Sequence, residues 1–130
     1  LQESNTMAAF LADRVFDNGL TVLDTEVSHL YITSTQAATY TEATATYDLG
    51  VKATPTVSAP ADRSGGGREV TVSAITDGSV TDTGTAGFYA LVDSSNSRLL
   101  AAGPLSATQA VTINNTFTLT SFKIGIPDPA

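Results

Sequence analysis

Three aspartates stand where apolar segments give way to turn-forming residues, and such carboxylates are candidate ligands for a hard cation. They are Asp77, Asp82 and Asp93. Calcium prefers several carboxylate and carbonyl oxygens, but the spacing of these aspartates matches no calcium-binding loop. Aspartate is also favoured in turns, because its side chain hydrogen-bonds the nearby backbone. We therefore expect turn formation here, and no metal or other cofactor.

The sequence offers little for catalysis. His29 is the only histidine and there is no cysteine, so a thiolate site cannot form and a zinc site would need carboxylates. No GxSxG elbow occurs, and a triad built on His29 would have only generic Ser and Asp residues to recruit. We expect no enzymatic activity.

Two segments are candidates for binding a partner. Residues 36–46 are rich in Thr and Ala with few groups to bury, which predicts a long surface loop or an edge segment. Residues 60–69 carry three glycines between two arginines, and because no helix follows, a hairpin tip is favoured over a phosphate-binding loop. We predict contacts to a neighbouring protein subunit from five residues: Tyr40, Glu42, Tyr47, Arg63 and Arg68. The alternative is that both segments are solvated loops.

The tyrosines offer a second kind of binding chemistry, because aromatic rings stack on sugars. There are four of them: Tyr31, Tyr40, Tyr47 and Tyr89. Such side chains more often fill the core and its rim. A sugar-stacking platform is therefore the less favoured alternative.

Strand-like segments must position these residues. About seven to nine of them alternate with turns, which predicts an all-β fold, an antiparallel β-sandwich of the jelly-roll or immunoglobulin-like kind. Gly84–Asp93 is apolar on both faces, so we expect it to be central. In residues 116–126 the apolar set changes face near Ser121, which indicates a bulge or a strand that passes between two sheets.

Further expectations concern where elements begin and end. Residues 7–18 carry helix formers and an apolar stripe, which predicts one short N-terminal helix that caps the sandwich or docks on a partner. Residues 20–26 fit a short strand or a helical turn. Residues 76–78 are expected to turn, and Gly103-Pro104 to end a strand at residues 98–102. The expected core holds nine residues: Leu30, Ile32, Val70, Val72, Phe88, Ala90, Val92, Leu119 and Ile124.

The composition limits which classes of protein and which kinds of partner are expected. The formal net charge is −7 and the six basic residues are scattered. Because nucleic-acid binding draws its affinity mainly from Lys and Arg, no nucleic acid is expected as a partner. No apolar run approaches the roughly 18 residues of a membrane span, so no membrane is expected either. The length predicts a single domain over residues 7–130, preceded by an added or disordered leader at residues 1–6.

Three segments carry a resemblance to known proteins. They are TYTEATATYDLG at residues 39–50, GSVTDTGTAGFYALVD at residues 78–93 and TFTLTSFKIGIPD at residues 116–128. With their flanking residues they resemble a family of small virion proteins of tailed bacteriophages, over nearly the whole chain from Met7. The resemblance assigns no binding residue.

This resemblance implies a location in the virion and a non-enzymatic structural role. The foremost expectation is a capsid decoration or cement protein that binds the outer head shell. Its partner would be the major capsid protein or another virion protein, and it would act as a homo-oligomer, with a trimer as one option. The alternative is a tail-tip, fibre or head-fibre module that contacts the host surface, with a glycan among its candidate ligands.

Overall fold

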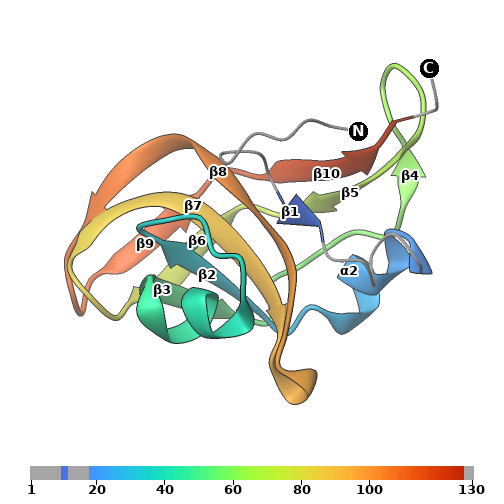
Figure 1. The fold of residues 1–130 in the computed structure, drawn as a ribbon. Helices are drawn as coiled ribbons and strands as arrows, with labels where there is room; N and C mark the ends of the chain where they lie inside the picture. The colour runs from blue at the N-terminus through green and yellow to red at the C-terminus, as the bar shows by residue number, and fades with distance from the viewer. Residues whose placement is uncertain (1–9, 12–17, 128–130) are drawn as a thin grey trace.

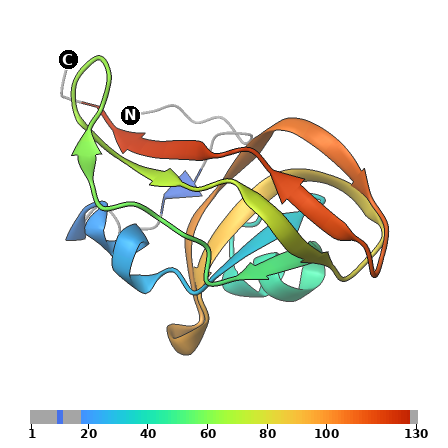
Figure 2. The same ribbon diagram turned by 180° about the vertical axis from the view of Figure 1, so that it is seen from behind.

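The computed structural model describes residues 10–11 and 18–127, which form two antiparallel β-sheets (Figures 1 and 2). The larger sheet has seven strands in the order β1-β8-β7-β2-β3-β6-β9, and the smaller has three in the order β10-β5-β4. The predicted all-β class is confirmed. The described residues hold ten strands, against the expected seven to nine, and β1 and β4 have only two residues each.

The strands are β1 (Phe10–Leu11), β2 (His29–Thr33), β3 (Asp48–Ala53), β4 (Ala61–Asp62), β5 (Arg68–Val72), β6 (Ile75–Val80), β7 (Gly84–Asp93), β8 (Arg98–Val111), β9 (Thr116–Leu119) and β10 (Phe122–Ile126). The helical elements are the α-helix α2 (Thr21–Glu26), the π-helix η1 (Glu42–Thr46) and the 3₁₀-helix η2 (Ser94–Asn96). Within the part of the chain that the structure describes, no helix is long and apolar enough to cross a membrane.

The N-terminal end of the described chain is a strand. Phe10 and Leu11 form β1, which pairs antiparallel with β8. The helix predicted for residues 7–18 is therefore wrong at these two positions, because pairing with a strand distant in sequence overrides local helix propensity. Residues 7–9 and 12–17 of that prediction lie outside the described residues.

Strand β7 is central, as predicted, and lies between β8 and β2. Its register with β8 shifts between Ala86 and Phe88, and such a bulge reverses the alternation of faces. Ala86 therefore joins Tyr89 in the main core, whereas Ala90 packs on the other face of the sheet. The prediction that Phe88 belongs to the core is wrong: after the bulge it shares the outer face with Ala90 and is only half-buried.

Strand β8 does not end at Gly103-Pro104, so that prediction is wrong. It runs on to Val111. Within the described residues β1 begins at Phe10, opposite Ala102, and the register of β8 with β7 shifts next to Pro104; proline is tolerated at such bulges. Because Phe88 faces Pro104 while Ala86 faces Gln109, residues 105–108 have no partner on β7.

The C-terminal strand passes between the two sheets. β9 pairs with β6 in the larger sheet, and β10 pairs with β5 in the smaller one. Thr120 and Ser121 lie between them. The change of face predicted near Ser121 is therefore confirmed, in the form of a sheet-to-sheet crossover (Figure 2).

Residues 76–78 lie inside β6, so the turn predicted there is wrong. The register of β6 with β9 is irregular between Ile75 and Gly78, and Gly78 pairs with Phe117. A Cβ on Gly78 would overlap three ring atoms of Phe117. The glycine serves close packing of a buried ring, and no turn is needed.

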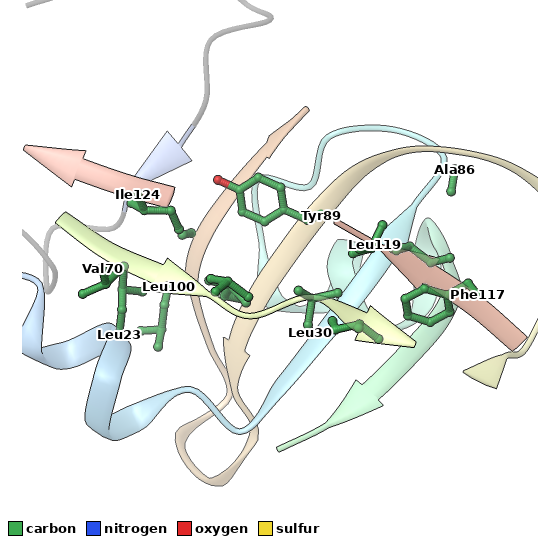
Figure 3. Packing of buried hydrophobic residues seen from close by; sticks show 14 of the residues in the cluster. Leu23, Leu30, Val70, Ala86, Tyr89, Leu100, Phe117, Leu119 and Ile124 are labelled. Atoms are coloured by element: carbon green, nitrogen blue, oxygen red, sulfur yellow. The ribbon is translucent and has the colours of Figure 1, made fainter. Parts of the chain in front are cut away.

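The main core joins both sheets and α2. Of the predicted segment of residues 20–26, residues 21–26 form the helix α2 rather than a strand, and its Leu23 is fully buried. Figure 3 shows Leu23 together with Val70 of β5, Ile124 of β10 and Leu30 of β2. Eight of the nine predicted core residues are buried: Leu30, Ile32, Val70, Val72, Ala90, Val92, Leu119 and Ile124.

Candidate functional site

The five residues predicted to contact a partner lie in two separate regions. Tyr40, Glu42 and Tyr47 lie in or beside η1, which packs on β2 and β3 of the larger sheet. Arg63 and Arg68 lie at the hairpin formed by β4 and β5 in the smaller sheet. Figure 1 shows these two regions at opposite sides of the molecule. The structure thus brings the first three together and leaves the two arginines apart from them.

The segment of residues 36–46 is not the open surface loop or edge that was expected. It folds into η1 and covers the outer face of the larger sheet. Its Ala37 and Ala43 are buried with small apolar residues of β7 and β8, and this second cluster consists of Ala37, Ala43, Ala90, Val92, Leu99 and Ala102. Because alanine has little side chain to displace, the segment can lie close to the sheet.

The side chain of Glu42 helps to begin this helical segment. The Thr39 hydroxyl accepts a hydrogen bond from the Glu42 N–H at 3.1 Å, and the Glu42 carboxylate accepts one from the Ala38 N–H at 2.8 Å. This is close to the capping box of a helix N-terminus. Glu42 therefore has a local structural contact, whatever further contact it makes.

Three aromatic side chains pack on the second cluster while remaining partly exposed: Phe10, Tyr31 and Tyr40. We call these three residues the aromatic face. They come from β1, β2 and the segment before η1, so the pairing of distant strands assembles them. Tyrosine at such a position presents apolar area together with a hydroxyl that remains accessible.

Asp48 lies beside the aromatic face at the start of β3. Its Oδ2 accepts a hydrogen bond from the Thr81 hydroxyl at 3.3 Å, whereas its Oδ1 is buried with no hydrogen-bond partner among the described residues. Burial raises the pKa of Asp48. Hydrogen bonds from Thr81 and the Gly50 backbone lower this pKa in part, and the negative charge of Asp82 raises it. Burial, and then the nearby Asp48, raise the pKa of Tyr31.

The arginine hairpin is stabilised from within. The three tip glycines, Gly65, Gly66 and Gly67, have φ values of 88°, 102° and 98°, a region that side chains with a Cβ rarely adopt. Arg63 Nη1 donates to the Gly66 carbonyl at 2.9 Å. Arg68 forms an ion pair with Asp62 at 2.7 Å. The predicted hairpin tip is confirmed, and both arginines have partners inside it.

The three candidate calcium ligands serve separate contacts. Asp77 forms an ion pair with Lys52 at 3.0 Å, Asp82 accepts a hydrogen bond from the Thr83 N–H at 2.9 Å, and Asp93 accepts one from the Asn96 amide at 2.8 Å. Over residues 10–11 and 18–127, no group of three His, Cys, Asp or Glu side chains gathers as a metal site.

The only histidine, His29, lies at the start of β2. Its Nδ1 lies 2.9 Å from the Ser28 hydroxyl, and its ring lies 6.2 Å from that of Tyr31 between centroids. The Ser28 hydroxyl also lies 3.0 Å from that of Ser94 and 2.9 Å from the Ser94 N–H. These bonds tie the start of β2 to the end of β7.

A cleft that the sequence did not predict opens between β8 and the crossover from β9 to β10. Its volume is about 260 Å³. One wall is residues 105–108 of β8, which have no partner on β7, and the other is the crossover. The residues that line it are Tyr89, Pro104, Leu105, Ser106, Ala107, Thr108, Gln109, Thr118, Leu119, Thr120, Ser121 and Phe122. The signals that could have located it are the change of face at Ser121 and the proline within β8.

Comparison with known proteins leaves the resemblance to phage virion proteins as a prediction. Neither a scan against protein-family models nor searches of curated proteins and of solved structures returned a match for this chain.

Proposed function

We propose that the chain is a non-enzymatic structural protein of a tailed-phage virion, a decoration protein that attaches to the outer shell of the head. The observation that carries this proposal in the structure is the aromatic face. Aromatic side chains are enriched at protein interfaces and supply much of their binding energy. Here the three aromatic side chains lie partly exposed on a cluster made mainly of alanines. Because alanine side chains protrude little, a neighbouring subunit can pack closely on this face.

The polar contacts of the described residues also favour a structural role. The carboxylates of Asp62 and Asp77 pair with basic side chains, and that of Glu42 accepts a backbone hydrogen bond. These contacts hold the hairpin, the sheet and η1 in place. In this proposal the two sheets are the layers of a β-sandwich, a rigid support for a surface that must match a repeated lattice.

The major capsid protein is the proposed partner, and the protein acts as a homo-oligomer, with a trimer as one option. A symmetric oligomer meets several capsid subunits at once, so modest contacts at each site multiply in effect. Tyr40 and Tyr47 would contribute on the η1 side, and the hairpin arginines Arg63 and Arg68 would lie at a second contact.

The test uses particles that lack the protein, to which purified variants are added. Tyr40→Ala should weaken attachment about tenfold or more if Tyr40 is a central interface residue. Thr112→Ala, which removes an exposed side chain in the turn after β8, is the matched control and should attach as the parent does. Equal occupancy for Tyr40→Ala and the parent, with equal melting temperatures, would rule out the aromatic face as the attachment surface.

A second function is favoured by the cleft between β8 and the crossover. A tail-tip, fibre or head-fibre module that contacts the host surface would use such a cleft for a glycan. The two functions differ in stoichiometry and gene position: a module of this kind is present in few copies and encoded among tail genes, whereas a decoration protein is abundant and encoded beside the major capsid gene.

A further inference from the structure

The cleft between β8 and the crossover has an aromatic floor. Tyr89 of β7 and Phe122 of β10 stack with their ring centroids 4.5 Å apart and their planes tilted by 42°. Leu105 and Leu119 add apolar contact area beside them. Because the two rings come from different sheets, the sheet-to-sheet crossover creates this floor. Such a surface suits a ligand with at least one apolar face.

Tyr89 is the one polar residue lining the cleft that is buried as a residue. The residue is 9% exposed, but its hydroxyl is not among the buried side-chain atoms that lack a partner; since no described residue hydrogen-bonds it, solvent can reach it. Burial raises the pKa of Tyr89 to about 12, so the phenol stays protonated at neutral pH and can donate a hydrogen bond. A hydroxyl that solvent can reach, and that no described residue hydrogen-bonds, can donate to a ligand in the cleft.

The rim of the cleft is polar and carries no charge. Hydroxyl groups stand on both walls, and no described residue hydrogen-bonds their side chains: Ser106, Thr108, Thr118, Thr120 and Ser121. Gln109 adds an amide, which donates to the Thr118 carbonyl at 3.0 Å. None of the twelve lining residues is ionisable except Tyr89. A charged ligand would enter without a counter-charge, at a high desolvation cost.

The volume limits the size of the ligand. About 260 Å³ is slightly below the ~300 Å³ at which pockets for drug-sized molecules begin. It accommodates one six-membered ring with its substituents. From the aromatic floor, the Tyr89 hydroxyl, the uncharged hydroxyl rim and this volume, we infer that the cleft binds one neutral pyranose unit of a glycan, with the partly exposed Phe122 ring against its apolar face and the Tyr89 hydroxyl as a hydrogen-bond donor.

This inference deepens the second proposed function, which places a glycan in the same cleft, and it does not rest on the proposed attachment to the head, because the cleft shares no residue with the aromatic face. A decoration protein and a fibre module could each carry such a site. If attachment through the aromatic face fails its test, glycan binding in the cleft is still tested by its own experiment, and the reverse also holds.

The test is a titration of the ¹⁵N-labelled protein by NMR with methyl β-D-glucopyranoside, methyl β-D-galactopyranoside and N-acetylglucosamine. At least one should shift the amide signals of residues 103–109 and 118–122 with saturation in the millimolar range. N-acetylneuraminic acid, which is charged, should leave them unchanged.

Two variants complete the test. Tyr89→Phe removes only the hydroxyl and should weaken binding about threefold to tenfold, the usual effect of one hydrogen bond. Tyr31→Phe, which removes a hydroxyl from the aromatic face, is the matched control and should bind as the parent does. The inference is overturned if none of the neutral sugars shifts these signals, if the charged sugar shifts them equally, or if Tyr89→Phe binds as tightly as the parent.

Discussion

Gly78 provides a direct test of how β6 and β9 pack. It is paired with Phe117, which is 1% exposed, and a Cβ at Gly78 would lie 2.6 Å from Cδ2 of that ring and overlap two further ring atoms. The ring is enclosed and cannot swing away, so Gly78→Ala should overpack the core. Overpacking of this kind typically costs about 1 to 3 kcal/mol.

The measurement is the free energy of unfolding from urea titration, with the melting temperature as a second readout. A loss of 2 kcal/mol corresponds to roughly 5 to 10 °C for a domain of this size. The matched control is Gly87→Ala in β7, where a Cβ would meet the nearest side-chain atom, Thr108 Cγ2, at an ordinary 3.6 Å. This control should change stability by less than about 0.5 kcal/mol.

A double variant separates steric overlap from other causes. Replacing Phe117 by Leu removes ring atoms that a Cβ at Gly78 would touch, so Gly78→Ala should cost less in that background than in the parent. The reasoning is refuted if Gly78→Ala leaves stability within about 0.5 kcal/mol of the parent, or if the cost is unchanged when the ring is absent.

Three further predictions follow from the contacts of single residues. Asp48 has a folded-state pKa above its unfolded value, so the folded state binds this proton more tightly, and stability should rise as pH falls through the folded pKa toward about 4. The difference in urea midpoint between Asp48→Asn and the parent should therefore vary with pH. A constant difference between about pH 4 and 7 would contradict this. Phe88→Ala should cost about 1 to 2 kcal/mol rather than the 3 to 5 typical of a fully buried ring, because Phe88 is half-buried; a loss above 3 kcal/mol would mean that it is enclosed. The double variant Arg63→Ala and Arg68→Ala should lower the free energy of unfolding by less than about 1 kcal/mol, since these are surface contacts of a hairpin tip. If this double variant occupies particles as fully as the parent across a salt series, the tip takes no part in attachment.

The local parts of the fold could be predicted from the sequence. The strand Gly84–Asp93 has its predicted bounds, because its apolar run is bounded by a glycine and by the turn formers Ser94–Asn96. The crossover near Ser121 was also evident, since the apolar residues change face there. These features depend on neighbouring residues alone.

The parts that depend on distant partners could not be predicted. Gly103-Pro104 is typical of a strand end, yet β8 continues, with a bulge in its pairing with β7 at that point. Phe10 and Leu11 fit a helix by propensity, but the free edge of β8 pairs with them instead. The bulge in β7 likewise turned Phe88 away from the main core.

The candidate sites divide in the same way. The hairpin tip with Arg63 was predictable, because consecutive glycines can adopt the positive φ values that a tight turn requires. The aromatic face and the cleft were not, since each collects side chains from strands far apart in sequence. Tyr89 was named as one of four tyrosines, but nothing near it in sequence indicated that Phe122 would be its partner.

The abundance of the protein in purified virions tests the central claim most directly. Quantitative mass spectrometry of intact particles gives the ratio of this chain to the major capsid protein. A decoration protein should be present on the order of hundreds of copies per particle, in fixed proportion to the capsid subunits, because a closed symmetric shell repeats its attachment sites. A handful of copies per particle, or none, would contradict a decoration role.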